Sequence, residues 1–330
     1  MVSNAFANHS KHGSFDTTLE NVRKRNLRER TVKILFATDG SGNARAAAGF
    51  LREFMREREI ELVLLTVSSP PDLSIHGNVQ NPDWEASQRN FIIDLHDELE
   101  DQFSGLGSEH LSKLHKTGSA AAEILKVATS IQPDLIVLGA VGHSMVHRML
   151  LGSVSDNVAT HAKCSVLIVR PQGESESPSM AAPKRIAIAY DGSAASSEAV
   201  NEMMAAQWHP DVVVDVVTVV PIYDVWMGEG ISVSAIKNEE EVFERMRKRG
   251  DEVSATVAKE IPNSHSHILR GQHVGEAIVD FCDSNDTDLV FVGDTGHGQL
   301  HDWLIGSTTK YVLRHAPCSV WVSRHDASKN

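Results

Sequence analysis

The sequence predicts an α/β protein made of two tandem doubly wound, Rossmann-like domains, each with a five-stranded parallel sheet. Its 330 residues suit two domains better than one, at about 100–200 residues per domain. Three separate segments recur in the same order in the second part of the chain. Between them, short apolar runs alternate with helical stretches, which is the pattern of βαβ units in a parallel sheet covered on both faces.

The recurring segments indicate a duplication of one unit of about 140 residues. The offset between the copies is 152 residues for the first pair of segments and 154 for the other two. The pairs are TVKILFATDGS (31–41) with PKRIAIAYDGS (183–193), PDLIVLGAVG (133–142) with TDLVFVGDTG (287–296), and HAKCSVLIV (161–169) with HAPCSVWV (315–322). Chance could supply one such pair, but not three in the same order.

Two accessory segments surround the copies. Residues 1–30 are polar and carry six Lys and Arg against three Asp and Glu, which fits a solvated tail, a short helix or a partner-binding arm. Residues 171–183 are rich in Pro, Ser and Glu, as linkers are. We therefore expect an N-terminal extension at 1–30, a first domain at 31–170, a linker at 171–183 and a second domain at 184–325.

Each copy begins with a short apolar run that ends at Asp-Gly-Ser, as a buried strand followed by a turn would. The elements expected next, in chain order, are a helix, a strand and a long Glu-rich helix. The first strands are expected at Lys33–Thr38 and Arg185–Tyr190, and the helices that follow them at Ala44–Glu57 and Ala194–Gln207. The second strands are expected at Glu61–Val67 and Val212–Val220, and the Glu-rich helices at 84–103 and 238–260.

Three further apolar runs complete five strands in each copy. They are expected at Leu111–His115 and His267–Leu269, at Leu135–Leu138 and Leu289–Val292, and at Ser165–Val169 and Ser319–Val322. A doubly wound sheet of this kind places its ligand site outside the carboxyl ends of the strands, where the strand order reverses.

Composition excludes several classes of protein. The formal net charge of −13 argues against a general nucleic-acid binder and against a protein spread over an anionic membrane surface. No apolar run approaches the roughly 18–20 residues that a membrane span needs, and the N-terminus has no hydrophobic signal, so we expect a cytoplasmic protein. Cys164, Cys282 and Cys318 form no C-x-x-C and fit reduced thiols.

Glycines gather where the ligand crevice is expected. The first copy has Gly139 after its fourth strand, Gly142 two residues further on, and Gly152 before Ser153. The second copy repeats this spacing with Gly293, Gly296, and Gly306 before Ser307. We expect a sharp, ligand-accessible backbone turn at the strand end and an anion-binding helix start after the last glycine. Two sets of N–H groups could then hold phosphates between them.

This G-2x-G-9x-G-(S/T) pattern, repeated in register behind an Asp at the end of strand one, resembles the ATP-binding branch of the universal stress protein family in its tandem form. The resemblance covers both copies, roughly 31–170 and 184–325. It implies ATP as ligand, with Asp39 and Asp191 toward the nucleoside and the backbones of Val67 and Val219 toward the adenine. The resemblance also implies which residues lie around the ribose and phosphates. They are Leu138, Gly139, Gly142, Gly152, Ser153, Val154, Val292, Gly293, Gly296, Gly306, Ser307 and Thr308.

The resemblance also implies that the two domains pair through their final strands, 165–169 and 319–322, as an intramolecular pseudo-dimer. Such pairing would remove an exposed sheet edge. A homodimer of whole chains and an unidentified regulatory partner are both left open.

Three aspartates near the expected crevice can be interpreted in more than one way. Asp39 and Asp191 could cap the following helices instead of facing a nucleoside. Asp294 stands where the first copy has Ala140, and a carboxylate repels phosphate unless a cation lies between them. Either Mg²⁺ or Mn²⁺ binds there, Asp294 points away, or the second copy binds nucleotide poorly, so the first copy is the better expected site.

Other chemistries find little support in the sequence. The pairs His143/His147 and His297/His301 have i, i+4 spacing but lack the Glu and the third ligand of a zinc site, so no protein metal site is expected. The sequence contains neither G-x-x-x-x-G-K-[ST] nor G-x-S-x-G.

The sequence therefore favours an ATP-binding, nucleotide-dependent regulator of the stress response, a non-enzyme with at most slow ATP hydrolysis. The alternatives are an adenylyl-transfer or hydrolase enzyme on the same sheet, and a structural interaction module without nucleotide.

Overall fold

The ten described strands form one continuous sheet in a computed structural model of the chain. The structure describes residues 31–54, 59–69, 82–103, 111–142, 151–171, 182–222, 233–295 and 305–324, with backbone alone at 82–85 and 233–239. The strand order is β3-β2-β1-β4-β5-β10-β9-β6-β7-β8. The first five strands belong to the first half of the chain (31–171) and the others to the second half (182–324).

The halves have the same sequence of elements. In the first half these are β1 (Val32–Ala37), α2 (Gly42–Phe54), β2 (Ile60–Ser68), α4 (Pro82–Phe103), β3 (Leu111–Thr117), α5 (Ala120–Ile131), β4 (Leu135–Gly139), α6 (Ser153–His161) and β5 (Ser165–Val169). In the second half they are β6 (Arg185–Ala189), α7 (Ala194–Ala205), β7 (Val213–Pro221), α8 (Val233–Val257), β8 (Ser264–Gly271), α9 (Val274–Ser284), β9 (Leu289–Gly293), α10 (Ser307–His315) and β10 (Ser319–Ser323).

The expected architecture of two doubly wound halves, each with five parallel strands, is confirmed. Within each half every described strand pair is parallel. The halves join where β10 runs antiparallel to β5, with Trp321 opposite Leu167. The expected adjacency of the two final strands within one chain is therefore also confirmed.

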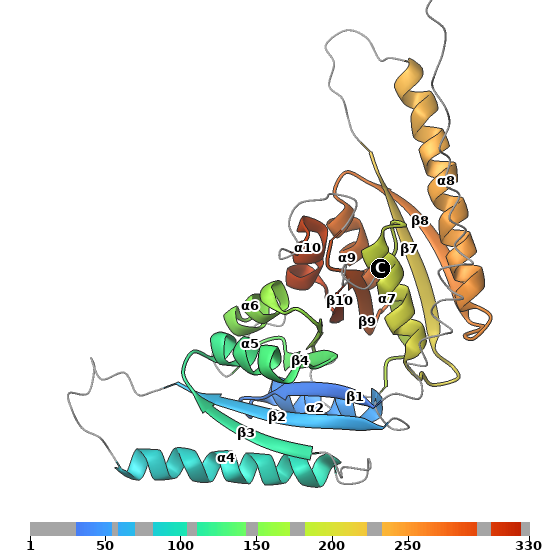
Figure 1. Cartoon of the computed structure of the whole chain (residues 1–330). Coiled ribbons are helices and arrows are strands. Elements are labelled where there is room, and N and C mark those ends of the chain that lie inside the picture. The colour runs from blue at the N-terminus through green and yellow to red at the C-terminus, as the bar shows by residue number, and fades with distance from the viewer. Residues whose placement is uncertain are drawn as a thin grey trace, which may run out of the picture.

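Helices cover both faces of the sheet because alternate strand residues point to opposite sides. Ile34 and Phe36 of β1 lie in a core with α2, α4, α7 and α8, whereas Leu35 and Ala37 lie in a second core with α5, α6, α9 and α10. The long helices α4 and α8 lie at the far ends of the sheet, next to β3 and β8 (Figure 1). In the described part of the chain, no helix is long and apolar enough to cross a membrane.

The structure moves several expected boundaries. The short run His267–Leu269 belongs to a strand, β8, that extends from Ser264 to Gly271. The Glu-rich helix α8 ends at Val257 rather than at residue 260, and Pro262 follows shortly after it. Helices α5 and α9 have no counterpart among the elements expected from the sequence.

Candidate functional site

The strand order reverses between β1 and β4 in the first half and between β6 and β9 in the second. Parallel strands end on the same edge, so the turn after β1, the end of β4 and the start of α6 meet at one place. This is the crevice position that doubly wound folds use for ligands.

The Asp-Gly-Ser turn after the first strand is closed by its own aspartate. Asp39 Oδ1 accepts the N–H of Ser41 at 3.0 Å, and Gly40 has φ of +76°, which favours glycine. The second half repeats this turn at Asp191 and Gly192.

The following helices are capped by serine rather than by aspartate. Ser193 Oγ accepts the N–H of Ser196 at 3.1 Å, and Ser41 Oγ accepts that of Ala44 at 3.3 Å. The alternative that Asp39 and Asp191 serve as helix caps is therefore wrong.

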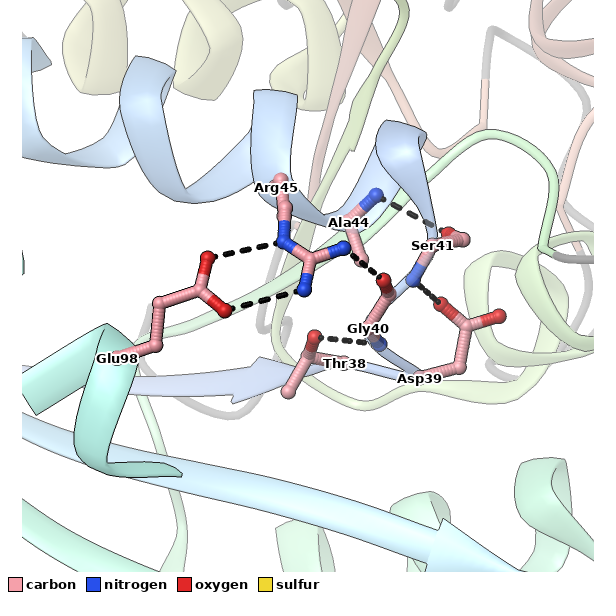
Figure 2. A network of polar contacts seen from close by, with 7 residues as sticks. All are labelled: Thr38, Asp39, Gly40, Ser41, Ala44, Arg45 and Glu98. Carbon is pink, nitrogen blue, oxygen red and sulfur yellow. Dashed lines mark hydrogen bonds and ion pairs between the residues drawn. The ribbon is translucent and has the colours of Figure 1, made fainter. Parts of the chain in front are cut away.

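An arginine ties the first turn to α4. Arg45 Nη1 donates to the carbonyl of Gly40 at 2.6 Å, while its Nε and Nη2 donate to Glu98 at 2.9 and 3.0 Å (Figure 2). These hydrogen bonds raise the pKa of Arg45 and lower the pKa of Glu98. Both side chains are about half exposed, so the pair orients the turn more than it stabilises the fold.

Asp39 and Gly142, both expected at the ligand site, lie against each other. A Cβ atom on Gly142 would stand 2.5 Å from Asp39 Oδ2. Figure 2 shows one carboxylate oxygen of Asp39 on the Ser41 amide and the other directed away from the turn. The Gly142 segment is held from α2, where Asn43 Nδ2 donates to the Val141 carbonyl at 2.9 Å.

Gly139 and Gly293 have a packing role that differs from the expected sharp turn. A Cβ atom at Gly139 would lie 2.9 Å from the backbone carbon of Asn43, and one at Gly293 would lie 2.6 Å from that of Ala195. Neither is among the described glycines with positive φ, which are Gly40, Gly118 and Gly192. These glycines allow the first turn of α2 or α7 to approach the strand end.

The start of α6 is fastened to β4. The Gly152 N–H donates to the Ala140 carbonyl at 2.8 Å, and Ser155 Oγ donates to the Gly139 carbonyl at 2.8 Å. The second half repeats both bonds, from Gly306 to Asp294 and from Thr309 to Gly293, each at 2.6 Å. The amides of Gly152 and Gly306 are thus already hydrogen-bonded within the protein.

The next amides of the helix start are arranged for an anion. The first bonds within the helices run from Asp156 to Gly152 and from Lys310 to Gly306. The N–H groups of Ser153 and Val154, and of Ser307 and Thr308, precede those bonds at the positive end of the helix dipole. Ser153 and Ser307 are exposed.

The remaining expected residues lie nearby or outside the described part. Leu138, Val292 and Val219 are buried in the second core, and Val67 packs against it, so their backbones are what they can offer a ligand. Gly296 lies outside the described residues, as do the pairs His143/His147 and His297/His301.

Asp294 faces an arginine from the end of β10. Its Oδ2 is 3.5 Å from Arg324 Nη1, and its Oδ1 accepts the hydroxyl of Thr295 at 3.3 Å. Both charged side chains are mostly buried, with 14% and 9% of their surfaces exposed. The charge of Asp294 is therefore compensated within the chain, so a metal ion is not needed to balance it.

Sequence reasoning missed the residues that hold the crevice together: Asn43, Arg45, Ser155, Thr309 and Arg324. Only Ser155 and Thr309 had a local signal, a hydroxyl three residues after the last glycine in both copies.

Comparison with known proteins gives a consistent result. The model of the universal stress protein family matches residues 31–170 and again 183–324. A Staphylococcus saprophyticus protein named as a universal stress protein is 29% identical over 140 residues, which are 42% of this chain and 83% of that protein.

Solved structures also resemble the whole chain. A universal stress protein from Archaeoglobus fulgidus has a TM-score of 0.60 at 21% identity and covers 92% of this chain and 100% of its own. A Pseudomonas aeruginosa protein described as functionally unknown has a TM-score of 0.57 at 17% identity, over 91% of this chain and 95% of its own. At these identities the likeness concerns the fold.

Proposed function

Because the chain belongs to the universal stress protein family, with two tandem domains, we propose that it is a nucleotide-dependent regulator that binds ATP at the carboxyl ends of β1 and β4. The observation that carries the proposal is the convergence of Asp39, Gly142 and the start of α6 at the point where the strand order reverses. The carboxylate suits a ribose hydroxyl, and the helix start suits phosphate.

The proposed ligand includes a divalent ion, Mg²⁺ or Mn²⁺, carried by the phosphates. Among the described residues, no three His, Cys, Asp or Glu side chains gather as metal ligands. The ion would therefore be bound through the nucleotide and would offset its charge.

We expect ATP turnover to be slow or absent. Fast hydrolysis needs a cation placed at the γ-phosphate. At the second crevice, the described cation Arg324 is already engaged by Asp294 and by carbonyls at the end of α6, so it is not available to a phosphate there. We propose the cytoplasm as the compartment, in keeping with three free cysteines.

A charge placed at the helix start tests the binding site without disturbing the helix. Ser153→Glu adds a carboxylate at the first helical position, where it favours the helix dipole but repels phosphate. We expect affinity for ATP to fall at least tenfold, measured by calorimetry with Mg²⁺ and by mass analysis of nucleotide retained after purification. Ser153→Ala is the control and should bind as the unchanged protein does.

The second half provides the matched variant, Ser307→Glu. If the first half is the main site, this variant loses less nucleotide than Ser153→Glu does. Retention of full affinity by the double variant would overturn the assignment of the site. No response of the unchanged protein to millimolar ATP or AMP would favour the interaction module instead.

A further inference from the structure

A cavity lies in the first half, between α4 and β3. Its volume is about 290 Å³, and most of its wall consists of apolar atoms. The residues that line it are Arg89, Ile92, Ile93, His96, Asp97, Lys113 and His115. This volume is near the lower end of the range for small-molecule sites, about 300–1,000 Å³.

Two imidazole rings form a fixed part of the wall. His96 Nε2 and Thr66 Oγ1 are hydrogen-bonded at 3.0 Å, and His115 Nε2 and Ser68 Oγ at 2.7 Å. Burial, followed by the nearby positive charge of Lys113 and by His115, lowers the pKa of His96, which outweighs the opposing effect of Asp97. The His96 ring is therefore neutral at pH 7 and presents a flat, weakly polar surface.

Among the described side chains that line the cavity, one cation has no charged partner. The ammonium group of Lys113 is held by Asp97 at 2.7 Å and by Glu100 at 2.5 Å, so its charge is compensated. Arg89 also lines the cavity, and none of the side chains that the structure describes pairs with it. An anionic group entering the cavity would meet the guanidinium of Arg89.

In the second half, side chains of α8 and β8 meet at the corresponding junction. Gly250 occupies the place of His96 there, because a Cβ atom on it would stand 3.1 Å from the hydroxyl of Thr218, the counterpart of Thr66. The guanidinium of Arg270 lies 4.2 Å from the centre of the Phe243 ring and binds Glu240 at 3.0 Å. An aromatic ring, an arginine and a carboxylate thus meet in this half.

In the first half, the three corresponding positions include an arginine but neither the ring nor the carboxylate. Arg89 stands at the position of Phe243, Thr117 at that of Arg270, and Ala86 at that of Glu240. We propose that the cavity between α4 and β3 binds a small aromatic monocarboxylate, whose ring packs on Ile92, Ile93 and the imidazoles while its carboxylate pairs with Arg89.

Benzoate is the probe, and the neutral benzamide, which has the same shape, is its matched control. In the full chain we expect benzoate to shift the ring NMR signals of His96 and His115, identified through His96→Gln and His115→Gln. Benzamide should bind at least fivefold more weakly. Arg89→Met should weaken benzoate about five- to tenfold and leave benzamide unchanged, whereas Lys126→Met, a charge loss on α5, should change neither.

A second variant transplants the junction of the other half. Arg89→Phe, Thr117→Arg and Ala86→Glu together should abolish benzoate binding, because the new arginine is then paired with a carboxylate as in the second half, while the protein stays folded by circular dichroism. The site does not depend on the nucleotide proposal, so Ser153→Glu should bind benzoate as the unchanged protein does. The proposal is overturned if tens of millimolar benzoate leave both histidines unshifted, if benzamide binds equally well, or if Arg89→Met binds benzoate unchanged.

Discussion

Glu202 binds both strands of the joint between the halves, which is the antiparallel pair β5 and β10, so its protonation state affects that joint. It lies on α7, and the corresponding position on α2 of the first half is Phe50. Its Oε1 accepts the hydroxyl of Ser165 on β5, and its Oε2 accepts the indole N–H of Trp321 on β10, each at 2.6 Å. Burial raises the pKa of Glu202 to about 7, against the opposite effect of these hydrogen bonds.

This shift predicts a pH dependence of stability with a definite sign. The unfolded chain releases the Glu202 proton near pH 4.3, about the ordinary value, whereas the folded chain holds it to about pH 7. Stability therefore falls as pH rises between these values, by up to about 1.4 kcal/mol per pH unit. Glu202→Gln should remove that part of the slope in urea unfolding measured from pH 5 to pH 7.

Glu241→Gln, at an exposed position on α8, is the control and should keep the original slope. A slope that is the same in Glu202→Gln and in the unchanged protein would show that this carboxyl ionises normally in the folded state.

Single residues of the crevice could be predicted from the sequence only where the signal was local. The repeated Asp-Gly-Ser and the spaced glycines indicated Asp39 and Gly142, which the fold brings together. Nothing local pointed to Arg324, because it reaches Asp294 and the end of α6 only through the pairing of β5 with β10. The packing role of Gly139 was not predicted, since glycines in packing contacts and glycines in turns cannot be told apart in a sequence.

At the scale of elements, α2 can approach β4 closely because Gly139 has no side chain. Gly139→Ala would place a methyl group 2.9 Å from the Asn43 backbone, where a helix rather than a flexible side chain has to move. We expect the free energy of unfolding to fall by about 1–3 kcal/mol, as for other overpacked sites. Chemical denaturation measures the change.

Gly42→Ala provides the matched control for that helix. A Cβ atom at Gly42 meets nothing within 4 Å, and the residue is exposed. Alanine there should leave stability unchanged or raise it by a few tenths of a kcal/mol through helix propensity. Equal effects of the two substitutions would contradict the packing role of Gly139.

Most elements follow from periodicity, and the exceptions have a physical reason. The strands were predictable because both faces of a covered parallel sheet are apolar. Helix α5 reads AAAEILKVATSI, and its apolar residues could equally belong to a buried strand by composition. Its helical state is decided by packing Ile124, Val127 and Ala128 on the sheet, which sequence alone does not display.

At the scale of the whole molecule, the halves exchange arginines across the joint. Arg170, after β5, donates to the carbonyls of Leu313 and Cys318 in the second half. Arg324, after β10, donates to Ala159 and Thr160 at the end of α6 in the first half. A cation at the C-terminus of a helix also interacts favourably with the negative end of the helix dipole. Each helix that starts at a crevice therefore ends on an arginine of the other half.

The exchange is unequal: of the two arginines, Arg324 alone faces a carboxylate, Asp294, among the side chains that the structure describes. Arg324→Met would leave that mostly buried carboxylate without its cation and should cost roughly 3 kcal/mol of stability. In the double variant with Asp294→Ala, much of this loss should be recovered, giving an interaction energy of at least about 1 kcal/mol in urea unfolding.

Arg170→Met is the matched control for that cycle, since the position facing Arg170 by symmetry is Ala140. Combined with Asp294→Ala, its effect should be additive within about 0.5 kcal/mol. Additive energies for Arg324 as well would mean that the guanidinium does not balance Asp294, and a divalent ion at the second crevice would again be needed. Strong coupling would instead show that the charge of Asp294 is balanced by Arg324, the same side chain that binds the end of α6 in the other half.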